Sequence, residues 1–360
     1  MKLKKIAIIG TVGLPAKYGG FETLAEYLTK NLATEFELSV FCSSKAYKNK
    51  QKTYNGAQLK YIPLQANGVQ SIPYDIISIF QAIFYADVLL ILGVSGCIIL
   101  PLVRLFSRKK IVVNIDGLEW KRAKWGKAAK WFLKFSEKLA VKYTHTVVSD
   151  NKVIQDYVLK EYHIKSELIA YGADHCKHEK LSKEVLSKFP FLTENYAFKV
   201  CRIEPENNIE MILEAFSAFT ELSFVIIGNW NNSAYGKRMK EKFTLFKNIH
   251  LLDPIYNQNI LNQIRSNCYV YIHGHSAGGT NPSLVEAMYL QLPILAYGVQ
   301  YNKETTQHKA IYFQDKQELI RVLFTLEATK LTVMAKNLKE VALNRYTWSI
   351  IAKQYGLLLR

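Results

Sequence analysis

The sequence has few cysteines, and none of them lies in a binding or redox motif. There are five, without a C-x-x-C pair and without the Cys/His spacing of a zinc site. They lie mostly in apolar stretches, at Cys42, Cys97, Cys176, Cys201 and Cys268. This pattern argues against a disulfide framework or a structural zinc site, and it favours reduced thiols in the cytoplasm.

The sequence also lacks a targeting segment and an uninterrupted membrane span. The basic start is followed by only about five apolar residues before Gly10, too few for a signal peptide. Residues 86–106 form one long apolar run with two charges, so hydropathy alone predicts a span. Glycines, a serine and a proline interrupt this run. We therefore predict a buried strand at 88–92, a turn, and a buried helix at 97–106.

Two common nucleotide-binding motifs are missing. No G-x-x-x-x-G-K-[ST] occurs, so the sequence has no P-loop. A glycine-rich loop follows the first apolar stretch, but Gly10 and Gly13 are spaced G-x-x-G. The next expected strand, at 38–42, ends in serines rather than in a ribose-binding acid. A nicotinamide-dependent oxidoreductase is therefore disfavoured.

Acidic residues are scarce, with 30 against 47 lysines and arginines and a net charge of +17. Much of the excess lies in residues 121–142, where cations alternate with aromatic residues and Glu137 is the only acid. This pattern is typical of a segment resting on an anionic membrane surface. The residues expected to contact the membrane or an acceptor are Trp120, Lys121, Arg122, Lys124, Trp125 and Trp131. A solvated helix with its aromatic residues in the core is the alternative, and nucleic acid is disfavoured because no nucleic-acid module is present.

Apolar stretches that predict strands alternate with helical patterns along the whole chain. They lie at 5–9, 38–42, 59–63, 88–92, 111–115 and 145–149, and again at 197–201, 223–227, 249–252, 268–272 and 293–297. With 360 residues, this alternation predicts an α/β fold of two facing Rossmann-like, doubly wound domains. The expected domains are residues 1–172 and 173–345, followed by a helix at 346–360 that packs back toward the first domain.

A glycine-rich turn joins the strand at 268–272 to a helix. Thr280 or Asn281 is the expected N-cap, and Pro282 takes the first helical position. The N–H groups near Ser283 and Leu284 are then expected to be free and to face a ligand phosphate. One turn later, Glu286 can accept hydrogen bonds from ribose hydroxyls. The alternative is an ordinary capped helix without a ligand.

A second glycine-rich turn lies near the start of the chain. It precedes a helical pattern that begins at Phe21, and Gly19 and Gly20 allow backbone and ligand to approach closely. Ligands of doubly wound sheets bind at the carboxyl ends of the strands, so two facing sheets are expected to bring both turns to one cleft. Arg202, at the end of the strand that opens the second domain, is expected to bind a diphosphate there.

Four motifs together resemble the retaining glycosyltransferases of family 4 and, more narrowly, their branch of bacterial polysaccharide rhamnosyltransferases. They are GLPAKYGGFET at 13–23, DGLEWKR at 116–122, RIEPENN at 202–208 and GGTNPSLVEAM at 278–288. The resemblance implies two facing Rossmann-like domains, the GT-B fold. It also implies transfer of a sugar from a nucleotide-diphosphate sugar to a lipid-linked saccharide at the inner face of the plasma membrane, without a metal or another cofactor.

The resemblance also implies roles for individual residues. Arg202 would neutralise the donor diphosphate, and Glu286 matches the second glutamate of the family's pair, which binds ribose. The donor-binding turn would consist of Gly279, Thr280, Asn281, Pro282, Ser283 and Leu284. Two positions depart from the family pattern, since Gly278 replaces the first glutamate and Asn207 replaces a lysine. The branch shares both departures.

Asp116 is the catalytic candidate, because it follows the strand at 111–115 where many relatives place a sugar-contacting histidine. Glu119 is the alternative to Asp116, and a third reading is that Asp116 only caps the next helix. Retaining transfer on this fold needs stabilisation of the leaving diphosphate and delivery of the acceptor hydroxyl on the same face of the sugar.

The leading hypothesis is a transferase of rhamnose from dTDP-rhamnose in capsule, O-antigen or cell-wall polysaccharide assembly, working as a cytoplasmic, peripheral membrane protein. One alternative is transfer of glucose or N-acetylglucosamine from a UDP-sugar. An alternative of another class is a membrane-bound scaffold of the same fold without catalysis, which Gly278 and Asn207 motivate.

Overall fold

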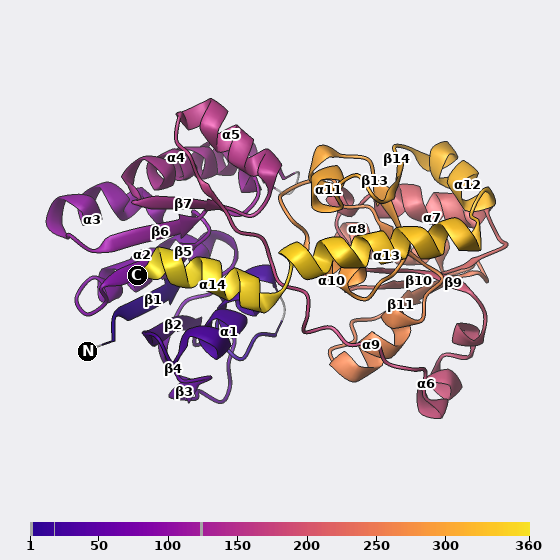
Figure 1. The fold of residues 1–360 in the computed structure, drawn as a ribbon, viewed down its shortest axis with the longest axis horizontal. Coiled ribbons are helices and arrows are strands. Elements are labelled where there is room, and N and C mark those ends of the chain that lie inside the picture. Colours follow the sequence, from indigo (N-terminus) through magenta and orange to yellow (C-terminus); the bar gives the residue numbers. More distant parts are fainter. Residues whose placement is uncertain (1–2, 18, 123–124) are drawn as a thin grey trace. The chain divides into compact units, whose positions relative to one another are not determined.

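The chain forms two α/β units, each built on one sheet (Figure 1). The computed structural model describes residues 3–17, 19–122 and 125–360. The first unit comprises Met1–Gly172 and Trp348–Arg360, and the second comprises Ala173–Thr347. All strand pairs are parallel except β3 with β4, so the predicted class of two doubly wound Rossmann-like units is confirmed.

The first unit has an eight-stranded sheet in the order β3-β4-β2-β1-β5-β6-β7-β8. The strands are β1 Lys5–Ile9, β2 Glu37–Ser43, β3 Thr53–Tyr54, β4 Ala57–Ile62, β5 Val88–Leu92, β6 Lys110–Asn114, β7 Thr146–Ser149 and β8 Glu167–Leu168. The helices are α1 Gly20–Leu32, α2 Ser71–Ala82, α3 Leu100–Phe106, α4 Lys127–Tyr143, α5 Lys152–Tyr162 and α14 Trp348–Leu359, with short 3-10 turns η1 Gly68–Gln70, η2 Cys97–Ile99 and η3 Glu119–Lys121. The strand order reverses between β1 and β5, which is where doubly wound sheets bind ligands.

The second unit has a six-stranded, all-parallel sheet in the order β11-β10-β9-β12-β13-β14. The strands are β9 Tyr196–Val200, β10 Ser223–Ile227, β11 Ile249–Leu252, β12 Val270–His273, β13 Ile294–Tyr297 and β14 Ile311–Phe313. The helices are α6 Lys183–Lys188, α7 Ile209–Ala218, α8 Ala234–Phe243, α9 Gln258–Ser266, α10 Pro282–Tyr289, α11 Gln300–Thr305, α12 Lys316–Phe324 and α13 Ala328–Arg345, with 3-10 turns η4 Pro190–Thr193 and η5 Pro205–Asn207. Here the order reverses between β9 and β12.

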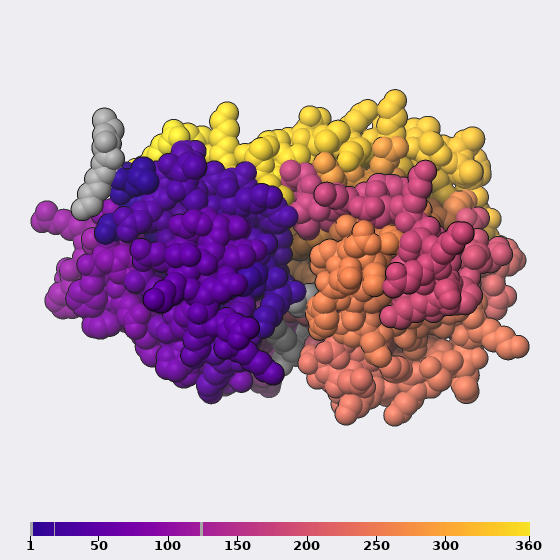
Figure 2. Space-filling model, turned by 90° about the horizontal axis from the view of Figure 1, so that it is seen from below, coloured from indigo at the N-terminus to yellow at the C-terminus, as the bar shows by residue number. Residues whose placement is uncertain are grey.

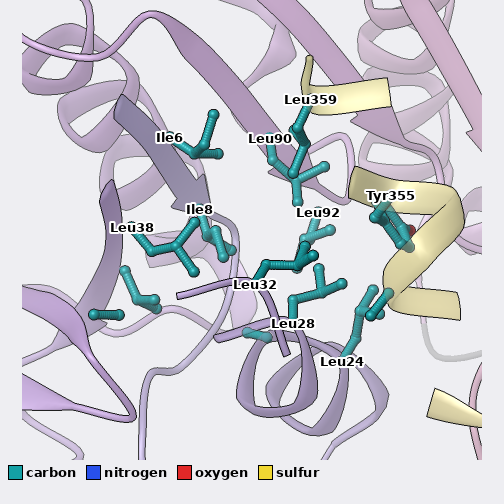
Figure 3. Close-up of a cluster of buried hydrophobic side chains, with 14 of the residues drawn as sticks. Ile6, Ile8, Leu24, Leu28, Leu32, Leu38, Leu90, Leu92, Tyr355 and Leu359 are labelled. Carbon is teal, nitrogen blue, oxygen red and sulfur yellow. The ribbon is translucent and has the colours of Figure 1, made fainter. Parts of the chain in front are cut away.

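The last helix of the chain completes the core of the first unit. Leu24, Leu28 and Leu32 on α1 recur at helical spacing and pack with the central strands, while Tyr355 and Leu359 of α14 lie in the same cluster (Figure 3). The Tyr355 hydroxyl also accepts a hydrogen bond of 2.8 Å from the Asn114 side chain at the end of β6. Residues 348–360 are therefore part of the first unit's fold.

Residues 179–182, which precede α6 in the second unit, pack on α9 of the same unit (Figure 2). The Glu179 N–H donates to Ser266 Oγ at 3.1 Å, and the Ser182 N–H donates to Gln263 Oε1 at 2.8 Å. The polar residues at the end of α9 thus satisfy the backbone of a segment with little secondary structure of its own.

The strands with long apolar runs lie where the sequence predicts them, within about two residues. The strands that were not predicted are β3, β8 and β14, with two, two and three residues. Each lies at the edge of its sheet. A strand this short carries no alternating pattern, so periodicity cannot reveal it.

The prediction of a buried helix at 97–106 is wrong. The segment forms η2 and α3. Within α3, all of whose residues the structure describes, only Leu100 and Val103 are buried. Leu102, Leu105 and Phe106 are exposed. Among the helices of the described residues, none combines the length and apolar character that crossing a bilayer requires.

Candidate active site

In the second unit, the loops after β9 and β12 lie next to each other at the reversal of the strand order. The chain runs from β9 to β10 and β11 on one side of the sheet, and from β12 to β13 and β14 on the other. Both strands are parallel, so their carboxyl ends meet at the same edge. This is the position at which doubly wound sheets bind their ligands.

Hydrogen bonds join these two loops into one block. Asn207 donates to the Arg202 carbonyl at 2.8 Å, and its Oδ1 lies 3.0 Å from His275 Nδ1. The Ser276 N–H and Oγ both donate to the Glu206 carbonyl, at 2.8 and 2.9 Å. Asn207 is buried, so the residue that replaces the family's lysine holds the loops together rather than carrying charge to a ligand.

Arg202 carries the exposed cation of this block. It lies two residues beyond β9, not at its last residue as predicted, because β9 ends at Val200. Among the described residues, its guanidinium has no hydrogen-bond or ion-pair partner. Backbone hydrogen bonds within the loop hold Arg202 in place. Its guanidinium is therefore suited to binding an anion through two parallel hydrogen bonds.

The start of α10 is capped as predicted, but its first N–H groups are not free. Asn281 is the N-cap, and its Oδ1 accepts from the Ser283 N–H at 3.0 Å, while Pro282 takes the first helical position. The Leu284 N–H donates to the Asn281 carbonyl at 3.0 Å. The expectation of free N–H groups is therefore wrong for this state of the loop. An anion here would replace the neutral cap and interact with the helix dipole.

The glycine at position 278 has a backbone conformation that other residues rarely adopt. Its φ is +102°, and a Cβ at this position would be 3.5 Å from His275 Nε2. The restriction is therefore conformational strain rather than lack of space. A glutamate at position 278 would therefore carry backbone strain in this conformation of the loop.

Glu286 is held by two basic side chains of the second unit. Its Oε2 accepts from Arg265 Nη1 at 2.6 Å, and its Oε1 lies 3.1 Å from His175 Nε2. Burial alone would raise the pKa of the carboxyl, but Arg265 and His175 outweigh it and lower the pKa to about 2. Glu286 is thus an ionised acceptor throughout the neutral range.

The sequence did not reveal the partners of Glu286. Arg265 lies 21 residues before it, and His175 lies 111 residues before it, so no local spacing connects them. The available signal was a cation on the otherwise buried face of a predicted helix, because a buried arginine requires a partner.

Among the described residues, one group of side chains has the composition and spacing to hold a metal ion. It consists of His175, Cys176 and Glu286, with one ligand atom from each within 4.8 Å of the others. The Arg265 guanidinium already contacts this carboxylate and is itself buried. A divalent cation here would add charge next to a fixed positive group. The contacts fit an ion pair that positions Glu286 better than they fit a metal site.

The glycine turn of the first unit is closed by its own carboxylates. The Val12 N–H donates to Glu22 Oε1 at 2.7 Å, and the Ala16 N–H donates to Glu26 Oε2 at 2.6 Å. Gly19 has φ +134°, and a Cβ there would lie 1.8 Å from Glu22 Oε2. The close approach that requires glycine at position 19 is thus that of Glu22, which lies in the first turn of α1.

Asp116 follows β6 in a strained conformation. Its φ is +61°, in the left-handed region, and its N–H donates to Asn114 Oδ1 at 2.9 Å. The alternative that Asp116 caps the next helix is wrong, because the N-cap of η3 is Leu118. The carboxylate of Asp116 lies 3.9 Å from the Arg122 guanidinium, whose Nε is 2.7 Å from Glu119 Oε2. The two catalytic candidates therefore share one arginine.

The residues predicted to contact a membrane divide into two groups. Trp120 and Trp125 donate their indole N–H to Glu137 and Glu119, each at 3.0 Å, and Arg122 is buried. The expectation of membrane contact is thus wrong for Arg122. By contrast, Trp131 is 69% exposed on α4, and Lys121 is exposed. Lys124 lies outside the described residues.

Family models match both parts of the chain. Residues 183–333 match the family described as glycosyl transferases group 1, and residues 3–174 match a domain of unknown function, DUF1972. The first match includes the loops of Arg202 and of Ser283, and the second includes Asp116.

The fold is also that of solved glycosyltransferase structures. Sucrose-phosphate synthase from Thermosynechococcus elongatus is 16% identical, with a TM-score of 0.79 over 99% of this chain and 98% of that one. HepE from Anabaena, solved with UDP-glucose, is 14% identical, with a TM-score of 0.75 over 99% of both chains. A glycosyltransferase from Rickettsia africae is 13% identical, with a TM-score of 0.74 over 100% of this chain and 98% of that one. Residues 183–333 therefore belong to the group 1 glycosyltransferases, residues 3–174 form a DUF1972 domain, and the chain as a whole has the GT-B fold.

Proposed function

We propose that this glycosyltransferase moves rhamnose from dTDP-rhamnose to a polyprenyl-diphosphate-linked saccharide. The observation that carries the donor part is the exposed Arg202 guanidinium on a loop that is hydrogen-bonded to the loop leading into α10. A guanidinium and a helix N-terminus at the reversal of a doubly wound sheet suit a nucleotide diphosphate.

The donor is then held by the second unit in three parts. Arg202 pairs with the diphosphate, and the turn from Gly279 to Leu284 binds it through backbone groups once Asn281 releases the Ser283 N–H. Glu286 accepts a hydrogen bond from the 3′-hydroxyl of the deoxyribose, with Arg265 and His175 fixing the carboxylate. Because Glu22 lies against Gly19, a phosphate there would meet a carboxylate, so we do not extend the donor proposal to Gly19 and Gly20.

The first unit supplies the group that meets the acceptor. We assign this role to Asp116, which the backbone strain and the Arg122 ion pair hold in one orientation. Glu119, on the same guanidinium, is the alternative. Charge develops on the leaving diphosphate and at the anomeric carbon, and electrostatic stabilisation suffices for such a reaction. No metal or other cofactor is part of the proposal, and the acceptor is presented at an anionic membrane surface on the cytoplasmic side.

A UDP-sugar is the second candidate donor. HepE, which shares the fold, was solved with UDP-glucose. Uracil and thymine present the same hydrogen-bonding edge and differ by one methyl group, which discriminates by only about 1–3 kcal/mol in an apolar pocket. UDP also carries a ribose 2′-hydroxyl, which can donate a second hydrogen bond to Glu286. Glucose or N-acetylglucosamine from a UDP-sugar therefore stays the alternative to dTDP-rhamnose.

The test is thermal unfolding of the purified protein with a panel of nucleoside diphosphates and nucleotide sugars. A ligand at 100 times its Kd stabilises the native state by about 2.7 kcal/mol. We expect dTDP and dTDP-rhamnose to give the largest shifts in unfolding temperature. A second measurement should then show turnover of dTDP-rhamnose. Larger shifts with UDP-glucose would favour the second candidate, and binding without any turnover would favour a scaffold of the same fold.

A further inference from the structure

One side of the first unit carries exposed apolar side chains from three consecutive helices. We call this set the apolar face: Phe80 and Phe84 on and directly after α2, Leu102, Leu105 and Phe106 on α3, and Trp131 and Phe135 on α4, each between 38% and 79% exposed. Helix α4 contacts both α3 and η2, and α2 contacts η2, so the three helices are neighbours (Figure 1). Contiguous exposed apolar residues of this kind mark an interaction surface.

The apolar face follows the helical repeat, so its side chains project together. Leu102, Leu105 and Phe106 lie on one side of α3, while Leu100 and Val103 point to the core. On α4, Trp131 and Phe135 stack with their ring centroids 5.6 Å apart. The face is therefore an ordered feature of these helices and not a scatter of single exposed residues.

The charges around the apolar face are mostly positive. Glu161 of α5 lies beside Trp131 and Phe135 but pairs with Lys134 at 3.0 Å, and Asp87 after α2 accepts from the Lys5 N–H. The exposed cations are Arg104, Arg108, Lys127, Lys138 and Lys142. All residues of α2, α3 and α4 lie within the described ranges, and the only carboxylates on these helices are Asp75 and Glu137. Both are buried. A surface of apolar side chains bordered mainly by cations, with its few carboxylates buried or paired, matches a bilayer with anionic headgroups.

A second copy of this chain fits the face less well. In a symmetric dimer the same patch is used on both subunits, which would bring the two sets of cations toward each other. Lipid headgroups of opposite charge remove this repulsion, and the acyl region accepts phenylalanine, leucine and tryptophan side chains.

We propose that the apolar face of α2, α3 and α4 is the surface on which this glycosyltransferase rests on anionic membranes. The proposal deepens the membrane part of the proposed function and rests on it. It also moves the contact away from Trp120, Arg122 and Trp125, whose polar groups bond within the protein, and keeps Trp131. The residues that it adds on α3 belong to the segment 97–106, which the sequence predicted to be buried.

Sedimentation with phosphatidylcholine vesicles, with and without phosphatidylglycerol, tests the proposal. We expect the wild type to bind the anionic vesicles and Leu105→Ser/Phe106→Ser to bind them at least about tenfold more weakly. Lys138→Glu/Lys142→Glu should reduce binding by roughly fivefold or more for each charge. Leu245→Ser/Tyr256→Ser in the second unit, at residues 86% and 69% exposed, is the matched control and should bind like the wild type.

Equal vesicle binding by the wild type and the Leu105/Phe106 variant would overturn the proposal, as would a wild type that does not bind or a control pair that loses binding equally. A wild type that dimerises by light scattering, with the Leu105/Phe106 variant monomeric, would assign the face to a second copy instead. Donor turnover measured without vesicles separates this proposal from the proposed function. A variant that loses membrane binding but keeps donor turnover supports the apolar face as the membrane surface. If the wild type itself shows no donor turnover, the proposed function fails, and the vesicle measurement still decides the membrane surface.

Discussion

The glycine turns of the two units both lie at the reversal of the strand order but are held by opposite chemistry. In the first unit, the turn after β1 donates its Val12 and Ala16 N–H groups to the carboxylates of Glu22 and Glu26. In the second unit, the turn after β12 is held by neutral groups, with Asn207 against His275 and Asn281 against the Ser283 N–H.

The difference shows why a glycine-rich turn alone does not define an anion site. A turn whose N–H groups face internal carboxylates is already saturated with negative charge, whereas one that a neutral amide caps can exchange this amide for a phosphate. The position of the exposed arginine then decides which turn serves the donor. Among the described residues, an exposed arginine belongs to the hydrogen-bonded block of only one turn. This is the turn of the second unit, and the arginine is Arg202.

The largest effect is expected for Arg202→Ala. Loss of the guanidinium removes charge-assisted hydrogen bonds to the diphosphate, so kcat/KM for the donor should fall by about 100- to 1,000-fold. The unfolding temperature should stay unchanged, because the side chain is exposed and has no partner among the described residues. Arg321→Ala, an exposed arginine on α12, is the control and should leave kcat/KM unchanged. A donor kcat/KM near normal in the Arg202 variant would remove the diphosphate role.

The second effect concerns the acceptor side of the comparison. Asp116→Asn should lower kcat by about 100-fold while the donor KM stays within a factor of about two, since Asp116 belongs to the first unit and the proposed donor residues do not. Asp156→Asn, on the surface of α5, serves as the control. If Asp116→Asn keeps its kcat and Glu119→Gln loses it, the catalytic role belongs to Glu119.

The third effect concerns Glu286. Its pKa is lowered to about 2 in the folded protein, so its stabilising contribution is complete above its ordinary value near pH 4.5 and is lost as the pH falls toward 2. Glu286→Gln should remove this part of the pH dependence and weaken nucleotide affinity by about tenfold. Unfolding temperature and nucleotide titration, both followed against pH, measure the two parts. An unchanged acid limb in the variant would contradict the ion pair.

The fourth effect separates stability from donor binding. Glu22→Ala leaves the Val12 N–H without its acceptor, so the free energy of unfolding should fall by about 2 kcal/mol. Nucleotide affinity should change by less than about twofold, because the carboxylate serves the turn of the first unit and not the donor. Denaturant unfolding and nucleotide titration give the two numbers, with Glu35→Ala on the surface as the control. A large loss of nucleotide affinity would return Gly19 and Gly20 to the donor site.

The smallest effect is expected for metal removal. Dialysis against EDTA should change donor turnover by less than about twofold, because Arg202 and the turn before α10 provide the charge stabilisation that a metal would otherwise supply. Activity that is lost in EDTA and restored by a divalent cation would instead point to the cluster of His175, Cys176 and Glu286.

The sequence predicted the fold and the start of α10 well, because both depend on local patterns. Apolar runs of five residues gave the central strands, and the order Asn281-Pro282 gave the start of α10. What an N-cap does with its side chain depends on geometry within one turn, so the hydrogen bond between the Ser283 N–H and Asn281 could not be predicted.

Burial of amphipathic segments was less predictable. The apolar composition of α3 suggested a core helix, but composition does not tell whether another element covers its outer side. Arg122 shows the reverse, since a cation in a basic segment is buried between Asp116 and Glu119. Contacts across long separations, such as Arg265 with Glu286, carry no signal in a single sequence.

The placement of α14 in the first unit makes the second unit an insertion within the first. Any fragment that stops before Trp348 would expose the apolar surface that Tyr355 and Leu359 cover, so residues 1–172 alone should aggregate rather than fold. On the ribosome, the second unit can finish folding before the first, although its synthesis starts later. A permuted chain that fuses residues 348–360 ahead of residue 1 would let the first unit be made in one piece.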